Sequence, residues 1–207
     1  MTTHTLALAI AYASSVVGVA QSVPQIVRAV RHPHMGGVAP LSWAISAVAC
    51  TAWITYGVRA GIGPQIPGNV LLVTGSVAIV LLVPSALPRA RRAGLLGAAA
   101  LAVVSLSSVL PPEGVGFLAF GIGLFSAWPQ VVTTLRGTPE AAGVSLATFG
   151  LRLVSGLGWF TYAILARDVP VIFSATVMLS TTLLVLVVEG QRRGAPALDE
   201  IGVLEPA

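Results

Sequence analysis

Apolar residues run along this chain in seven long stretches, and the short polar loops between them hold most of the charged residues. The hydrocarbon core of a bilayer, about 30 Å thick, takes roughly twenty apolar residues as a helix. Each stretch is close to that length. The pattern therefore predicts an all-α membrane protein with seven transmembrane helices. They are expected near residues 6–30, 41–58, 66–83, 93–110, 115–135, 144–166 and 170–188.

A Pro-Gln pair stands late in an apolar stretch at two places, Pro24-Gln25 and Pro129-Gln130, and several residues around it recur as well. The spacing is 105 residues up to the following loop and 106 residues after it. A recurrence of this length predicts two copies of one three-helix unit. Proline inside a helix removes a backbone donor and clashes with the carbonyl four residues back, so a hinge is expected in each copy. The hinge residues are Pro24, Gln25, Pro129 and Gln130.

The stretch at 93–110 has no counterpart. Three crossings leave the chain on the opposite side of the membrane, so one more crossing is needed before a second copy in the same orientation. We therefore expect parallel repeats with the substrate site between them, near the middle of the membrane. The predicted division is residues 1–84 for the first repeat, 85–112 for a loop and linker helix, 113–190 for the second repeat, and 191–207 for a disordered cytoplasmic tail.

Composition supports the membrane assignment and excludes several other classes. The chain is 56% hydrophobic and 9% charged, whereas soluble domains carry about a quarter charged residues. Its net charge of +4 comes from arginines in short loops, which predict an outer N-terminus and a cytoplasmic C-terminus and do not form a nucleic-acid-binding face. The single cysteine, Cys50, excludes an internal disulfide framework. No cofactor is expected, and His32 and His34 lack the further ligands of a metal site.

The doubled Pro-Gln pair, the Trp-x-x-Tyr motifs at Trp53 and Trp159, and the run from Pro64 to Asn69 together resemble the PQ-loop superfamily. Within it, the chain is similar to the SWEET and SemiSWEET sugar carriers. The resemblance implies seven helices in a 3+1+3 arrangement that carry a sugar by alternating access. It implies hinges at the two Pro-Gln pairs. It also assigns pocket positions to Trp53, Trp159, Cys50 and Asn69.

The chemistry of the pocket positions suits a sugar, which offers an apolar face and a rim of hydroxyls to an aromatic ring and an amide. Alternatively, Trp53 and Trp159 fill the bundle or anchor it at the membrane interface, and Asn69 joins two helices by a hydrogen bond. The residue that matches Asn69 in the second repeat is Ala175. This asymmetric pocket leaves the choice between a monosaccharide, a disaccharide and another substrate open.

Several further residues are candidates for a gate or an auxiliary role. Arg152 lies two turns before Trp159 on nearly the same helix face, where it binds an anionic substrate or extends to the lipid headgroups. A gate is expected at the outer end, where charges form a weak pair or lie in a solvated loop. The residues of this outer group are Tyr56, Arg59, Tyr162, Arg167 and Asp168.

The leading functional hypothesis is a passive uniporter for a small sugar, since the helices hold no Asp or Glu away from their ends. The alternatives are a carrier of an amino acid or small organic anion that Arg152 binds, and a membrane cargo receptor. An enzyme is not expected because no nucleophile-base pair or metal set occurs at membrane depth. The expected partners are a mono- or disaccharide, membrane lipid and, as an open option, a second copy of the chain.

Overall fold

The computed structural model describes residues 2–31, 40–136 and 146–194, and seven α-helices account for nearly all of them. No strand occurs in these ranges, so the prediction of an all-α protein with seven helices is confirmed. The helices are α1 (Thr3–Arg31), α2 (Pro40–Ala60), α3 (Gln65–Leu82), α4 (Arg89–Val109), α5 (Pro112–Arg136), α6 (Leu146–Ala166) and α7 (Val169–Gly194).

Two helix ends differ from the expected ones because polar residues continue the helix beyond the apolar stretch. α4 begins at Arg89, directly after Pro88, so its first turn consists largely of arginines. α7 runs on to Gly194, and Arg192 donates to Glu189 at 3.0 Å along this extension. The tail was expected to begin at residue 191, and the part of it beyond Gly194 lies outside the described residues.

Length and composition make this chain a multi-pass integral membrane protein. Six helices contain an apolar segment long enough to cross a bilayer, and the described apolar segment of α5 is the shorter Pro112–Ser126. Large apolar side chains point outward, among them Val109, Phe125 and Trp128, which are 78%, 72% and 67% exposed. An outer surface of this kind fits hydrocarbon, where a helix satisfies its own backbone polar groups.

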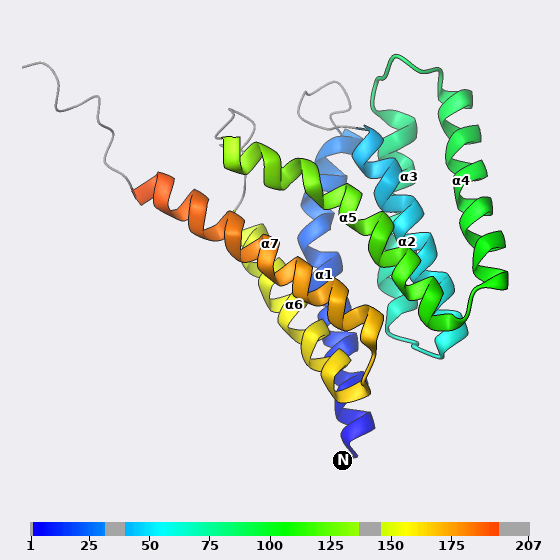
Figure 1. Cartoon of the computed structure of the whole chain (residues 1–207). Coiled ribbons are helices and arrows are strands. Elements are labelled where there is room, and N and C mark those ends of the chain that lie inside the picture. Colours follow the sequence, from blue (N-terminus) through cyan, green and yellow to red (C-terminus); the bar gives the residue numbers. More distant parts are fainter. Residues whose placement is uncertain (1, 32–39, 137–145, 195–207) are drawn as a thin grey trace, which may run out of the picture.

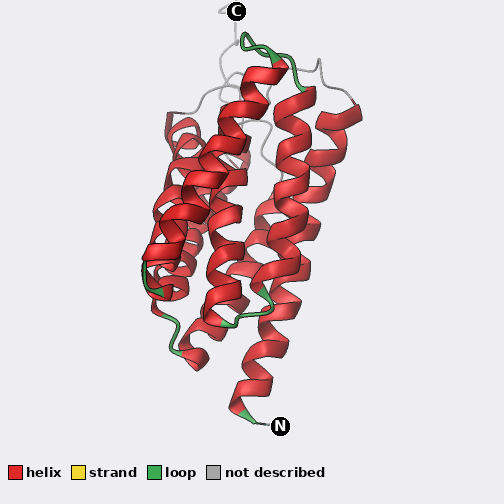
Figure 2. Ribbon diagram, turned by 90° about the vertical axis from the view of Figure 1, so that its right-hand side faces the viewer, coloured by secondary structure: helices red, strands yellow, loops and turns green. Residues whose placement is uncertain are grey.

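The helices run up and down along one common direction, so that the bundle has two distinct ends (Figure 2). The N-terminal end holds the first residues of α1, α3, α5 and α7. The opposite end holds the last residues of these helices and is called the arginine-rich end. Its described arginines are Arg31, Arg89, Arg91, Arg92, Arg136 and Arg192.

The packing of the first three helices matches that of the last three. α3 contacts both α1 and α2, and α7 contacts both α5 and α6. The two groups meet through α1 against α6 and α2 against α5, while α4 lies at the edge of the bundle against α2 (Figure 1). Because α1 corresponds to α5 and α2 to α6, the two cross-contacts are equivalent. This is the packing that parallel repeats about one axis would produce, although the repeat boundaries themselves stay a prediction.

Apolar packing closes the N-terminal end across both groups. The N-terminal-end cluster contains side chains from α1, α5, α6 and α7, from α2 and from the loop after α2. Its buried members are Ala7, Ala11, Tyr56, Ile62, Val115, Tyr162, Ala163 and Val171. A smaller cluster toward the other end, built on Ile79 and Val83, joins only α1, α2 and α3. Among the described residues, the two groups are thus held together most extensively at the N-terminal end.

The C-terminal ends of α2 and α6 turn in the same way with different residues. Ile62 donates its N–H to the carbonyl of Gly57 at 2.7 Å, and Asp168 donates its N–H to Ala163 at 2.9 Å. Both turns place the preceding residue in the left-handed region, Gly61 at φ +71° and Arg167 at φ +56°. This is the Schellman cap, in which glycine avoids the steric strain that a side chain creates. α6 therefore holds a strained arginine where α2 has glycine.

These matched caps predict unequal effects of substitution on the free energy of unfolding. A Cβ added at Gly61 meets nothing within 4 Å, so Gly61→Ala introduces backbone strain alone and is expected to lower the free energy of unfolding by about 1 kcal/mol. Arg167→Gly removes the same strain and is not expected to lower it. Thermal unfolding of both variants in detergent checks this. A loss of stability in Arg167→Gly equal to that in Gly61→Ala would contradict the strain at Arg167.

Candidate functional site

A cavity of about 190 Å³ lies between the two helix groups. It adjoins the N-terminal-end cluster, because Val171 belongs to both and the cavity residues Trp53 and Trp159 pack against that cluster. The cavity extends from there toward the arginine-rich end. Its lining residues are Ser15, Gly18, Val19, Gln21, Trp53, Gln65, Gly68, Asn69, Leu72, Ser155, Trp159, Val171, Ser174, Ala175 and Met178.

Two tryptophans form matching parts of the wall. Trp53 meets Tyr56 edge to face, with ring centroids 5.7 Å apart and an interplanar angle of 70°. Trp159 meets Tyr162 at the same 5.7 Å with an angle of 90°. Both tyrosines are 4% exposed, so each holds its tryptophan against the closed end of the bundle. Edge-to-face packing fixes the orientation of the two indole rings.

Amide groups from α3 supply much of the polarity of the cavity. Asn69 donates through Nδ2 to the carbonyl of Gln65 at 2.7 Å and to Gln65 Oε1 at 3.2 Å. These bonds hold the Asn69 amide in place, and no described residue donates to its Oδ1. Gln65, which is 5% exposed, was missed from the sequence. Its position four residues before Asn69, on the same helix face, was the available signal.

Most of the wall consists of pairs of residues that lie 106 positions apart. Trp53 pairs with Trp159 in this way, and four pairs come from α3 and α7. The four are Gln65 with Val171, Gly68 with Ser174, Asn69 with Ala175, and Leu72 with Met178. The α3 side carries two amides, whereas the α7 side is apolar apart from one hydroxyl. The two helices therefore contribute residues at equivalent positions, but the side chains at these positions differ in polarity.

Close packing of α1 against α6 forms another wall. Ser155 donates through Oγ to the carbonyl of Ser14 at 2.9 Å, and both residues are buried. A Cβ at Gly158 would collide with Ser14 Oγ, and a Cβ at Gly18 would lie 3.0 Å from Ser155 Oγ. Small residues therefore let the two helix backbones approach each other. Ser155 was not identified from the sequence because isolated serines are common in membrane helices.

A buried hydrogen bond joins the two helix groups at the N-terminal end. The Tyr56 hydroxyl donates to Asp168 Oδ1 at 2.7 Å, and the N–H of Val171 donates to the same oxygen at 3.2 Å. Asp168 is 8% exposed, and its Oδ2 is buried without a hydrogen-bond partner. Burial raises the pKa of Asp168 and nearby Glu113 adds to this, while the two hydrogen bonds oppose the shift.

The structure does not bring the other gate candidates together. Arg59 donates to the carbonyl of Ser107 and, at 2.6 Å, to that of Leu110, so it caps the last turn of the linker helix α4. Arg167 is exposed, and the described residues offer it no ion pair. Cys50 lies one turn before Trp53 on α2 and does not line the cavity. The structure thus assembles Trp53, Trp159, Asn69 and Ala175 at one site, with Tyr56, Tyr162 and Asp168 beside it.

The hinge candidates lie within long helices. Pro24 and Gln25 are in α1, and Pro129 and Gln130 are in α5, each pair in the half of its helix near the arginine-rich end. The backbone at these positions is described as helix, while the four side chains lie outside the described residues. The hinge role therefore stays a prediction.

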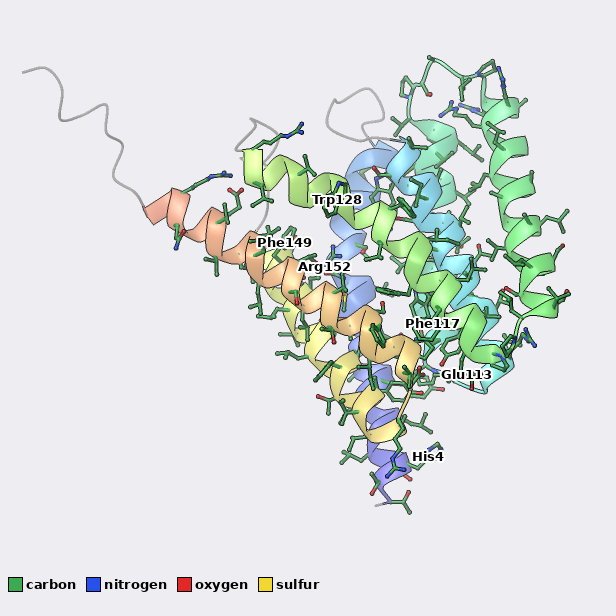
Figure 3. All side chains as sticks on the ribbon, viewed as in Figure 1. His4, Glu113, Phe117, Trp128, Phe149 and Arg152 are labelled. Carbon is green, nitrogen blue, oxygen red and sulfur yellow. The ribbon has the colours of Figure 1, made fainter. Side chains whose placement is uncertain are left out.

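Arg152 lies on α6, one turn beyond the cavity residue Ser155 toward the arginine-rich end. Its Nε is buried and has no hydrogen-bond partner. Figure 3 shows its side chain on the α1 side of α6, inside the outline of the bundle. Arg152 does not line the cavity itself. It places a cation close to the cavity, and the described residues offer this cation no ion pair.

Comparisons with known proteins show the fold. Neither a family model nor a curated protein matches the chain. Among solved structures, the chain is similar to a eukaryotic SWEET transporter with a TM-score of 0.73 and 15% sequence identity. The similarity covers 92% of this chain and 100% of that chain. The chain therefore has the SWEET-like seven-helix fold.

The raised pKa of Asp168 leads us to expect that the stability of the fold depends on pH. Since burial raises its pKa in the folded state, the fold retains the Asp168 proton to a higher pH than the unfolded chain does. Stability associated with the protonated group is therefore lost as the pH rises above about 4, the ordinary range of an aspartate. Asp168→Asn keeps an acceptor for Tyr56 and does not titrate. Unfolding temperatures in detergent from pH 4 to pH 8 should fall more steeply for the wild type than for Asp168→Asn.

Glu113→Gln is the matched control for this experiment, because Glu113 is an exposed acid at the same end of the bundle. It removes one charge that raises the pKa of Asp168, so it should reduce the pH dependence only in part. Parallel pH profiles for the wild type and Asp168→Asn would show that Asp168 is not the titrating group.

Proposed function

We propose that this protein is a passive uniporter that moves a small sugar across a membrane by alternating access. The observation that carries the proposal is the cavity between the two helix groups, with two tryptophan rings and two α3 amides in its wall. The SWEET-like fold supports it, since the similar solved structure is that of a transporter. In that reading, the cavity is the substrate site and the helix groups are the moving bodies.

The wall chemistry fits a sugar better than a fully apolar ligand. An indole ring packs against the C–H face of a pyranose, and an amide both donates to and accepts from hydroxyl groups. Asn69 Oδ1 is free to accept, and Gln21 lines the cavity with a buried Oε1 that has no partner. A ligand hydroxyl at either oxygen would supply the missing donor.

The closed N-terminal end supports alternating access. The Tyr56–Asp168 hydrogen bond and the N-terminal-end cluster hold the two groups together on one side of the cavity. In the cycle we propose, this contact opens when the groups tilt about α1–α6 and α2–α5, and the Pro-Gln pairs permit the bending. With the N-terminus outside, as the arginines favour, the structure corresponds to a state closed to the exterior.

The proposal of an uncoupled mechanism rests on the lack of acidic residues in the cavity wall. Its lining residues include no Asp or Glu, so none of them can carry a coupled proton as a carboxylate does. Asp168 lies at the closed end and does not line the cavity. A carrier of a small organic anion is the alternative that Arg152 favours. Both proposed functions, sugar uniporter and anion carrier, would use the same cavity and the same transport cycle.

Uptake of labelled glucose into proteoliposomes tests the proposal. We expect uptake by the wild type to be independent of an imposed pH gradient and to fall about tenfold or more in Asn69→Ala, because the variant loses the amide that binds hydroxyls. Trp159→Ala should reduce uptake to a similar extent through loss of the ring face. Absence of uptake for a panel of mono- and disaccharides would contradict the sugar proposal.

Thr74→Ala is the matched control for Asn69→Ala. Thr74 is on the same helix, but it is exposed and its hydroxyl donates only to Val70 of its own helix at 2.9 Å. Uptake by Thr74→Ala should equal that of the wild type. If both variants lose uptake equally, the effect belongs to the stability of α3 and not to the cavity.

A further inference from the structure

A second cavity, of about 260 Å³, lies between the linker helix α4 and helices α2 and α3. It shares no residue with the cavity between the two helix groups. Because α4 lies at the edge of the bundle, this cavity belongs to the outer side of the first helix group (Figure 1). We call it the α4 groove. Its lining residues are Ala47, Thr51, Val73, Val77, Leu81, Ala93, Leu96, Gly97 and Ala100.

The wall of the α4 groove is apolar. Thr51 alone among the lining residues has a polar side chain, and its hydroxyl already donates to the carbonyl of Ala47 at 2.9 Å. A cavity with such a wall does not hold water and accepts an apolar ligand. On α4, the lining residues Ala93 and Gly97 are exposed, and a Cβ added at Gly97 meets nothing within 4 Å. The groove is therefore open to the surroundings of the bundle.

The groove lies within the part of the chain that crosses the membrane. Helices α3 and α4 are both long and apolar enough to span a bilayer. Along α3 the groove extends from Val73 to Leu81, a rise of about 12 Å at 1.5 Å per residue. One leaflet contributes about 15 Å of the hydrocarbon core. The groove thus follows most of the depth of one leaflet, and the apolar molecule that surrounds it there is a lipid acyl chain.

Arg89 lies at the end of the groove that faces the arginine-rich end. It precedes the lining residue Ala93 by four positions, so the two share a face of α4. Its Nε donates to the carbonyl of Leu81, another lining residue, at 3.0 Å. This bond fixes the guanidinium beside the groove. No described residue accepts from its two terminal nitrogens, which are donors in the same planar group.

Arg92 adds a second positive charge at the same place. It donates to the carbonyls of Val80 and Val83, the latter at 2.7 Å, on either side of Leu81 in the chain. Helices α2, α3 and α4 contain no Asp or Glu, and neither Arg89 nor Arg92 has an ion pair with a described residue. The end of the apolar groove is therefore cationic.

We propose that the α4 groove binds an anionic phospholipid, with one acyl chain between α2, α3 and α4 and the phosphate at Arg89. The apolar wall is complementary to the chain, and a guanidinium binds a phosphate through parallel N–H donors. The orientation proposed above puts this end in the cytoplasmic leaflet, where anionic lipids gather and basic pockets between membrane helices bind their headgroups. The site is separate from the cavity between the helix groups, so the proposal does not rest on sugar transport.

The unfolding temperature of the full chain in detergent tests the headgroup contact. Phosphatidylglycerol should raise it at a concentration at least tenfold lower than phosphatidylcholine with the same acyl chains. In Arg89→Gln this preference should fall about tenfold. Arg91→Gln is the matched control, because Arg91 is an exposed arginine two positions later, on the opposite side of α4. It should keep the preference of the wild type.

Native mass spectrometry of the same protein tests the acyl-chain contact. Gly97→Phe places a ring in the groove, whereas Gly94→Phe adds the same ring on α4 at a position that does not line it. A Cβ at Gly94 also meets nothing within 4 Å, so the two substitutions are matched in steric cost. The wild type and Gly94→Phe should each retain a bound phosphatidylglycerol, and Gly97→Phe should not.

Several outcomes would overturn the proposal. Equal responses to the two lipids would exclude a headgroup site, and glycerophosphate as effective as phosphatidylglycerol would show an anion site without an acyl chain. If Gly97→Phe converts an oligomer to a monomer in size-exclusion chromatography and still retains the lipid, the groove is an interface between copies of the chain. If both glycine variants lose the lipid through misfolding of α4, the arginine pair decides: equal lipid preference in Arg89→Gln and Arg91→Gln would exclude the site.

Discussion

The hydrogen bond between Tyr56 and Asp168 joins the two helix groups at the end where the bundle is closed. Both partners are buried, so opening this end exposes an apolar cluster and separates a carboxyl group from its donor. The tryptophans of the cavity pack against the tyrosines of the same cluster. The orientation of the indole rings therefore depends on the closed end, and a movement that opens it also alters the cavity wall.

Equivalent helices carry unequal chemistry in this protein. The 106-residue spacing places Trp53 opposite Trp159 and Asn69 opposite Ala175, and the cavity contains all four. An identical pair of walls would present the same groups twice to a ligand. Here the amides lie on α3 and an apolar face lies on α7, which suits a ligand with one polar and one apolar side. The same spacing places Asp168 where the first group has Ile62, so only one of two equivalent sites accepts a tyrosine hydroxyl.

Three arginines of the chain, Arg59, Arg92 and Arg152, show two different physical situations. Arg59 and Arg92 donate to carbonyl groups at the ends of α4 and α3, where a helix leaves acceptors unpaired and its dipole favours a cation. Arg152 lies within a helix, where carbonyl groups already bond to the backbone, and its Nε has no partner. The first situation has a sufficient structural reason. Arg152 has no helix-end carbonyl of this kind among its partners in the described part of the chain.

The amino-acid sequence by itself determined seven helices, their approximate limits and the correspondence between the two groups. These features follow from local causes, namely the length of apolar stretches and the recurrence of Pro-Gln and Trp-x-x-Tyr. It also singled out Trp53 and Trp159 through the recurrence, and Asn69 through the resemblance to the SWEET carriers. Only the tertiary structure decided that Gln65 joins the cavity and Cys50 does not, that Arg59 caps α4, and that Asp168 accepts from Tyr56. Each of these depends on the rotation and distance of a neighbouring helix, which the periodicity of a single helix does not specify.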